Sequence, residues 1–176
     1  FDTLEYHVNS VSSDASQYKD TSTSQATIKL RVGQEVVQRF VLKELRKLGD
    51  IAADAASLAS IGVGSTDGQV LLEVAEGNGP VNALAKALVK ALLPLFPSLE
   101  FVELRDYKVR ILDNDAATAA IPRVLIEFQD TQLGTRWTTA SADANIISAS
   151  FNALVDGVEY HIEHRNRAQE DEAFMQ

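Results

Sequence analysis

The chain has 176 residues, 45% of them hydrophobic, so it is long enough to bury a core as one domain or two small fused units. Its formal charge of −9, with no basic stripe, argues against a nucleic-acid partner or an anionic membrane surface. The lack of cysteine excludes disulfides, a thiolate nucleophile and a cysteine-type zinc site. The sequence shows no signal peptide and no apolar run that could span a bilayer. Because the lack of cysteine fits a reducing compartment, we expect a cytoplasmic protein. Because the chain opens at Phe1, we expect a piece of a longer protein.

The first half of the chain predicts strands over residues 4–11, 26–32 and 69–75, of which 26–32 shows the cleanest alternation of apolar and polar side chains. Before the third strand, apolar residues at helical spacing predict an inserted helical pair over about 37–60. A glycine-rich turn then leads into a helix that starts at Pro80, where the missing N–H of proline costs nothing.

The second half predicts the same order of elements. Strands are expected over residues 104–112, 123–128 and 135–140, followed by a long amphipathic helix over about 144–163. The last residues, 165–176, are charged, and we expect a frayed tail.

The two halves are similar enough to indicate an internal duplication. Tyr6-x-Val8 matches Tyr107-x-Val109, and the two helices share the spacing of their apolar residues. We therefore predict an α+β fold of two βββα units related by a pseudo-twofold axis. Unit one covers about 1–96 with the helical pair inserted, and unit two covers about 99–164. The helix starts at Gly79 and near Asp143 are then equivalent places.

The turn Gly77-Asn78-Gly79 is the first candidate for chemistry. A helix start offers unpaired N–H donors and a partial positive charge, which suit a carboxylate or a phosphate. The turn lacks the third glycine of a dinucleotide fingerprint, and no P-loop Lys-Ser/Thr follows, so nucleotide binding is disfavoured. A purely structural turn is the alternative.

Two histidines, His161 and His164, are close enough on one helix to hold a metal, with Glu159 or Glu163 completing the site. The favoured alternative is that both suit the negative end of the helix dipole near its last turn. Four aspartates could serve as paired acids, but most fall at strand ends or turns, where aspartate is common. They are Asp106, Asp113, Asp115 and Asp130. No catalytic constellation is visible.

Runs of small residues at 116–120 and 140–144 offer a further possibility. Such side chains either leave an apolar hollow between the units or let backbones pack tightly. A hollow beside two helix N-termini would suit a small zwitterion with an aliphatic side chain.

The stretch Glu-Gly-Asn-Gly-Pro-Val-Asn-Ala-Leu at 76–84 resembles the G-[DN]-G-P-V-[DN]-A motif of the LeuA-type regulatory domain. That domain is the C-terminal part of 2-isopropylmalate synthase and of citramalate synthase. Residues 104–112 and 145–160 are similar to a strand and a helix of its second unit. The resemblance covers 69–164 well, and we assign 1–164 to the domain.

The resemblance implies a homodimer formed through this domain, with an end-product amino acid bound between the units at the dimer interface. It also implies an N-terminal TIM barrel in the same chain that uses a divalent metal to condense acetyl-CoA with a 2-oxo acid. For this fragment it implies no cofactor, no metal and no catalytic residue. The family's effector-binding positions fall on Leu104, Tyr107, Ile111, Thr118, Ala120, Ala142, Asp143, Ala144, Gly77, Gly79 and Pro80.

The tyrosine-containing strand, residues 137–139 and the Glu159-Tyr160 pair look closest to the citramalate branch, which favours isoleucine as the effector. Leucine, through 2-isopropylmalate synthase, is the alternative, as is a dimerisation module without a ligand. Two features depart from the family pattern. The helical pair at 37–60 replaces a short hairpin, and Ser141 stands where glycine is frequent.

Overall fold

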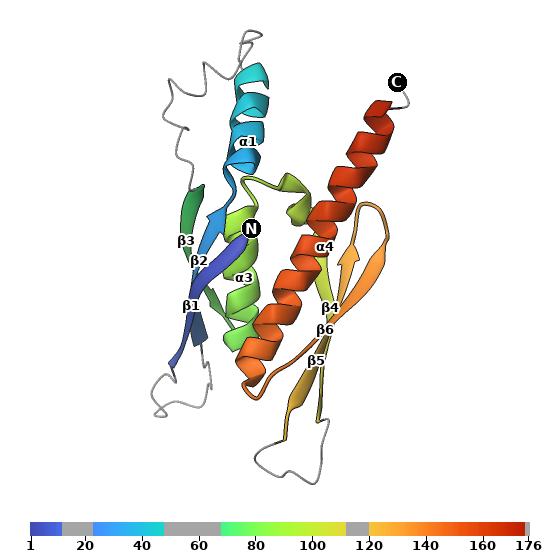
Figure 1. Cartoon of the computed structure of the whole chain (residues 1–176). Coiled ribbons are helices and arrows are strands. Elements are labelled where there is room, and N and C mark those ends of the chain that lie inside the picture. Colours follow the sequence, from blue (N-terminus) through green and yellow to red (C-terminus); the bar gives the residue numbers. More distant parts are fainter. Residues whose placement is uncertain (12–22, 48–67, 112–119, 175–176) are drawn as a thin grey trace.

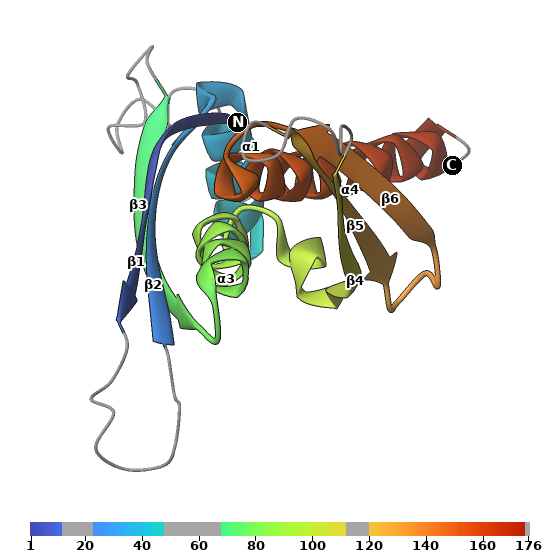
Figure 2. The same cartoon turned by 90° about the horizontal axis from the view of Figure 1, so that it is seen from below.

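The computed structural model describes residues 1–11, 23–47, 68–111 and 120–174. Two three-stranded antiparallel sheets form the two outer layers (Figures 1 and 2). Sheet A has the order β1-β2-β3 and sheet B the order β4-β5-β6. The strands are β1 (Asp2–Val11), β2 (Thr23–Val32), β3 (Gln69–Gly77), β4 (Val102–Ile111), β5 (Pro122–Asp130) and β6 (Arg136–Ala142).

Two helices lie between the sheets, α3 (Pro80–Leu92) mainly against sheet A and α4 (Ile146–Phe174) mainly against sheet B. Figure 1 shows both helices starting at the same end of the molecule and running side by side. The 3-10 helix η1 (Pro97–Phe101) joins α3 to β4, and α1 (Gln34–Lys47) follows β2. The predicted fold of two βββα units with a helical insertion in the first is confirmed.

The core is one cluster that crosses both units. Every second residue of the central strands is buried, as in Ile28 and Leu30 of β2 and Val124 and Ile126 of β5. Each such side chain contributes about 1.5–3 kcal/mol by leaving water. Because a strand alternates its faces and a helix buries one stripe, this pattern places both helices inside the sandwich.

One pair of equivalent core positions differs in size between the units. Val32 and Ala91 are buried in unit one, and their counterparts in unit two are Phe128 and Gly157. A Cβ on Gly157 would lie 2.2 Å from the Phe128 ring, so only glycine lets α4 lie this close to the larger side chain. The larger side chain of Phe128 on β5 is thus offset by the missing side chain of Gly157 on α4.

Two β-bulges support the duplication. The pairing of β1 with β2 shifts between Thr3 and Glu5, and that of β4 with β5 shifts between Leu104 and Asp106. When Tyr6 is aligned with Tyr107, these bulges fall at equivalent positions. The two edge strands therefore share their irregularity as well as their sequence pattern.

The structure differs from the sequence prediction mainly in the helices. α4 continues to Phe174, whereas its end was expected near 163 and a frayed tail beyond it. No glycine or proline interrupts residues 164–174, and most of them are good helix formers, so nothing stops the helix there. The second helix of the predicted pair, at 51–59, lies outside the described residues. None of the described helices is long and apolar enough to cross a membrane.

Candidate functional site

The inner face of β4 carries three of the predicted effector-binding residues. Leu104, Tyr107 and Ile111 share this face because the bulge inserts one extra residue after Leu104. Their strand partners, Phe128, Ile126 and Pro122, lie on the core side of β5. Even so, 42% of Leu104 and 59% of Ile111 is exposed. The inner face of this edge strand is therefore apolar but incompletely covered.

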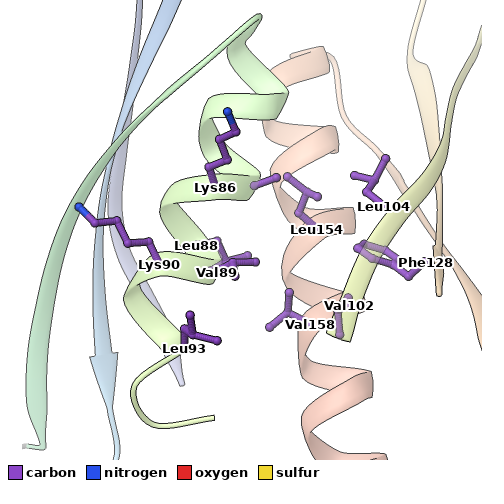
Figure 3. Close-up of a pocket in the computed structure, with 11 residues that line it drawn as sticks. Lys86, Leu88, Val89, Lys90, Leu93, Val102, Leu104, Phe128, Leu154 and Val158 are labelled. Atoms are coloured by element: carbon purple, nitrogen blue, oxygen red, sulfur yellow. The ribbon is translucent and has the colours of Figure 1, made fainter. Parts of the chain in front are cut away.

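A cavity of about 390 Å³ lies between α3 and β4 and reaches the face of α4 (Figure 3). Branched side chains from α3, α4 and β4 point toward one another across it. Among the described residues that line it, Lys86 and Lys90 are the only charged ones, and their ammonium groups are directed away from its centre. Such a cavity suits an aliphatic group. Its lining is Ala85, Lys86, Leu88, Val89, Lys90, Leu93, Val102, Leu104, Phe128, Leu154 and Val158.

The equivalent place in the other half is closed by the chain itself. Tyr6 of β1 packs its ring on Phe151 of α4, with the centroids 4.4 Å apart. Its hydroxyl donates to Ser148 Oγ at 3.0 Å. The α-amino group of Phe1 lies 3.9 Å from a carboxylate oxygen of Glu159. Strand β1 therefore covers the helix of the opposite unit.

Tyr107 makes a different contact from its counterpart. Its hydroxyl lies 2.8 Å from Ser150 Oγ, and Ser150 donates its own proton to the carbonyl of Ile146 at 2.6 Å. Tyr107 must then be the donor to Ser150. This bond ties β4 to the helix of its own unit and leaves the side of α3 open.

The glycine turn before α3 is held close to the helix. Gly77 is buried, and a Cβ there would lie 2.5 Å from the Ala83 amide nitrogen and 2.6 Å from Asn82 Oδ1. Glycine is therefore required at Gly77 for packing, which supports the structural reading of the turn. Gly79 is the N-cap of α3 and has open space around it, and no side chain caps this helix.

The start of α4 is built differently. Asn145 Oδ1 accepts the amide hydrogen of Ile147 at 2.9 Å, which is the arrangement of a side-chain N-cap. Asp143 Oδ1 in turn accepts from the Asn145 amide at 2.7 Å. The two helix starts are equivalent in the duplication, but only that of α4 is capped by a side chain.

Most of the remaining predicted positions that the structure describes lie at the end of the molecule where β4 finishes. Ile111 pairs with Pro122, and the Asp143 amide donates to the Pro122 carbonyl at 3.4 Å. Ala142 ends β6 in the same region, and Ala120 lies two residues before the start of β5. Both helices start at this end of the molecule (Figure 1). Ala144 lies between β6 and α4, Pro80 opens α3, and Thr118 lies outside the described residues.

Of the predicted positions that the structure describes, only Leu104 lines the cavity. Sequence reasoning did not select Val89 of α3, its C-cap Leu93, or Leu154 and Val158 of α4 as site residues. The sequence does indicate a second apolar surface on this helix. Val89 and Leu93 are apolar but lie outside the stripe of the helix that faces sheet A.

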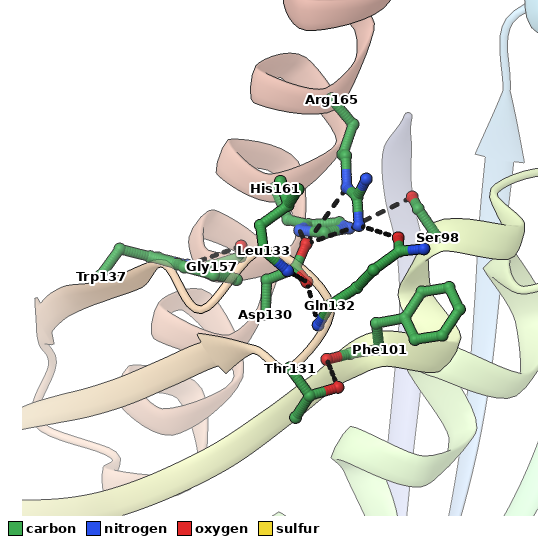
Figure 4. A network of polar contacts seen from close by, with 10 residues as sticks. All are labelled: Ser98, Phe101, Asp130, Thr131, Gln132, Leu133, Trp137, Gly157, His161 and Arg165. Atoms are coloured by element: carbon green, nitrogen blue, oxygen red, sulfur yellow. Dashed lines mark hydrogen bonds and ion pairs between the residues drawn. The ribbon is translucent and has the colours of Figure 1, made fainter.

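A buried polar network anchors unit two at the end of the molecule opposite to the helix starts (Figure 4). Asp130 is 1% exposed, and its Oδ1 accepts the amide hydrogens of Gln132 and Leu133 at 2.8 and 2.9 Å. Its Oδ2 lies 2.8 Å from Arg165 Nη2 and 3.7 Å from His161 Nδ1. Burial alone would raise the pKa of Asp130, but these amides and cations together hold it below its usual value.

His161 is held in place by its surroundings. Its Nε2 lies 3.1 Å from Ser98 Oγ, and its ring stacks on Trp137 with centroids 5.6 Å apart. Burial lowers the pKa of His161, although the Asp130 carboxylate opposes that shift. His164 packs against Tyr160 instead. Because α4 runs on to Phe174, the expectation that both histidines lie in its last turn is wrong.

No group of three or more histidine and acidic side chains that could hold a metal is present among the residues that the structure describes. Asp106 pairs with Lys108 at the surface. Asp113 and Asp115 lie outside the described residues. In the described part, the polar groups thus serve turns, caps and inter-element contacts.

Comparison with known proteins agrees with this architecture. Residues 4–162 match the family model of the LeuA allosteric (dimerisation) domain. An (R)-citramalate synthase of Synechocystis is 50% identical over 104 residues, and one of Geobacter sulfurreducens is 50% identical over 95. The matched segments make up 59% and 54% of this chain but 18% of each relative. An (R)-citramalate synthase of Sulfolobus acidocaldarius is 38% identical over 59% of this chain and 19% of its own. The chain therefore belongs to the LeuA allosteric (dimerisation) domain family.

Proposed function

We propose that this chain is the regulatory domain of a citramalate synthase that condenses acetyl-CoA with pyruvate, and that it binds a branched-chain amino acid for feedback inhibition. Its family and the names of its relatives support this assignment. In this proposal the domain forms a homodimer in the cytoplasm and follows an N-terminal TIM barrel that holds a divalent metal.

One observation carries the proposal of an effector site. The inner face of β4 is apolar and exposed at Leu104 and Ile111, whereas the equivalent face of β1 is covered by α4. An aliphatic side chain that came to lie there would gain about 1.5–3 kcal/mol by leaving water. Such a site needs no change in the fold, because the apolar lining is already assembled.

Isoleucine is the favoured effector, since the named relatives are citramalate synthases. Leucine is the alternative, and would suit a domain of 2-isopropylmalate synthase. The position of one methylene in an apolar pocket is worth only about 1–3 kcal/mol, so the two differ by roughly 10- to 200-fold at most. A dimerisation module without a ligand remains the third possibility.

Calorimetric titration of the chain with isoleucine, leucine and valine tests the proposal. We expect saturable heat with isoleucine and weaker binding of the other two. A ligand at 100 times its dissociation constant should stabilise the fold by about 2.7 kcal/mol, which a melting curve will show.

Variants of the matched tyrosines locate the site. Tyr107→Ala should reduce the ligand-induced melting shift, and Tyr6→Phe should leave it intact. No heat with any of the three amino acids, for a folded chain, would refute ligand binding. An unchanged shift in Tyr107→Ala would remove Tyr107 from the site.

A further inference from the structure

A second cavity lies at the end of the molecule opposite to the starts of α3 and α4. It has a volume of about 370 Å³ and is enclosed by α1, the connection from α3 to η1, η1 itself and α4. Figure 1 shows α1 and the second half of α4 at this end, with η1 between them. The cavity shares no lining residue with the one between α3 and β4. It is therefore separate from the proposed effector site.

The duplication does not account for this cavity. One of its walls is α1, which belongs to the helical insertion of unit one. In unit two, β5 leads directly into β6 through the turn at 131–135, so no helix lies at the equivalent place. The repeated βββα fold can thus form without such a cavity, and its lining is a feature of the insertion rather than of the fold.

The walls of the cavity are rich in aromatic rings. Phe40 of α1, Phe96 before η1 and Phe101 at the end of η1 all line it and are partly buried. Such rings prefer other rings as offset-stacked or edge-to-face neighbours. The volume also lies within the range of small-molecule sites, roughly 300–1,000 Å³. An aromatic ring is therefore the group that these walls suit best.

Polar contacts hold the floor of the cavity in place. Arg165 lines it, with Nη2 2.8 Å from Asp130 Oδ2 and donating to Gln132 Oε1 at 2.7 Å. The Phe101 carbonyl accepts the amide hydrogen of Thr131 at 2.8 Å, which ties η1 to the same turn. Figure 4 shows these groups together. A ligand that binds between fixed walls loses little of its binding energy to ordering them.

Exposed charged residues of both signs also line the cavity. Arg39 and Lys43 come from α1, and Glu100 comes from η1. None of the three forms an ion pair within the part of the chain that the structure describes. Glu44 of α1 is a further lining residue. The cavity therefore offers partners for both a negative and a positive group of one ligand.

Arg39 and Lys43 are an unfavourable pair within α1 itself. They lie four residues apart, so their like charges are neighbours on the helix surface and oppose helix formation. A carboxylate bound between them would offset this repulsion, and an arginine can bind it through two parallel hydrogen bonds. A dianion such as phosphate would suit the cavity less, because Glu44 and Glu100 would repel it.

We propose that this cavity is a second ligand site, which binds the zwitterion of an aromatic amino acid. The ring of the ligand would lie among the three phenylalanine rings. Its carboxylate would bind Arg39 and Lys43, and its ammonium group would bind Glu100. Each feature of the lining thus matches one part of the ligand. The inference does not depend on which effector binds between α3 and β4.

Calorimetric titration with phenylalanine and two truncated analogues is the first test. The analogue 3-phenylpropionate lacks the ammonium group, and 2-phenylethylamine lacks the carboxylate. We expect saturable binding of phenylalanine. Each analogue should bind roughly 10-fold more weakly, because it leaves a charged group of the site without its partner.

Charge variants assign the two ends of the ligand. Lys43→Gln should weaken the binding of phenylalanine and 3-phenylpropionate but not that of 2-phenylethylamine. Glu100→Gln should weaken the binding of phenylalanine and 2-phenylethylamine but not that of 3-phenylpropionate. Lys29→Gln is the matched control, because Lys29 is exposed on β2 and outside the cavity lining, and it should change none of the three affinities. Circular dichroism checks that every variant folds.

A third test separates this cavity from the one between α3 and β4. Phenylalanine binding should persist in Tyr107→Ala and in an excess of isoleucine, and Phe40→Leu should weaken it. No saturable heat with phenylalanine, or equal affinities for all three compounds, would overturn the proposal. So would displacement of phenylalanine by isoleucine, its loss in Tyr107→Ala, or full binding in Phe40→Leu.

Discussion

The equivalent edge strands β1 and β4 share a tyrosine, a bulge and an apolar inner face, yet only one of them is covered. Tyr6 of β1 lies against Phe151 and Ser148 of α4, in the opposite unit. Tyr107 of β4 binds Ser150 of its own unit. The duplication thus gives two equivalent places where an edge strand faces the helix of the other unit. The chain itself closes the one at β1, the closed cleft. The one at β4 contains the cavity next to α3, and this open cleft has room for another molecule.

The largest expected effect on stability comes from the buried polar network at Asp130, which anchors unit two. Asp130→Ala would leave Arg165 and His161 without their buried carboxylate and two turn amides without an acceptor. We expect a loss of about 3–5 kcal/mol in the free energy of unfolding, measured by denaturant titration. Asp106→Ala is the control, because the Asp106 pair with Lys108 is exposed, and it should leave stability almost unchanged. Equal effects in the two variants would contradict this account.

The next prediction tests the exchange of volume between the units. Gly157→Ala should cost about 1–3 kcal/mol, because its Cβ would press into the Phe128 ring. Adding Phe128→Val reproduces the residue pair of unit one. A double-mutant cycle of urea unfolding should show favourable coupling between the two substitutions. Strict additivity would mean that the two positions do not share a volume constraint.

The tyrosine hydroxyls give a smaller effect on stability. Tyr6→Phe and Tyr107→Phe each remove one hydrogen bond to a serine of α4, at an expected cost of about 0.5–1.5 kcal/mol. Thermal melting should therefore give similar losses. We expect the two variants to differ in effector binding, with only Tyr107→Phe affected. An equal loss of effector binding in both variants would contradict the conclusion that only the cleft at β4 is open to the effector.

The smallest effect is a pH dependence specific to the network at Asp130. Burial lowers the pKa of His161, so the unfolded chain takes up that proton first as the pH falls. Its contribution to stability is complete above about pH 6.5 and is lost below it. The pKa of Asp130 is also lowered, so its contribution is lost only in more acidic solution, below the ordinary aspartate range. Unfolding curves of His161→Gln should lack the first decline; an identical pH profile would exclude His161 as its source.

Alternation along the strands and the helical stripes were sufficient to predict the order of elements, because these patterns depend on local periodicity. The duplication was also visible in the sequence. The cavity was not predicted, since it depends on how β4 lies relative to α3. That placement follows from tertiary contacts such as Tyr107 with Ser150, which no local pattern encodes.

Asp130 shows how one residue can carry two signals in the sequence. It ends β5 and binds the amides of the following turn, as its position predicts, and it also continues the inward series Val124, Ile126 and Phe128. An acid at a core-facing position indicates a buried partner, and Arg165 on α4 supplies it. The same contact explains His161 better than a metal site does.

The central claim is that the open cleft between α3 and β4 receives the effector. Methyl-resolved NMR during an isoleucine titration tests it most directly, since the cleft contains Val89, Leu93 and Leu104. We predict that these methyl signals shift in a saturable manner, while Val8 under the closed cleft does not. Shifts confined to other regions, or none at saturating isoleucine, would contradict the claim.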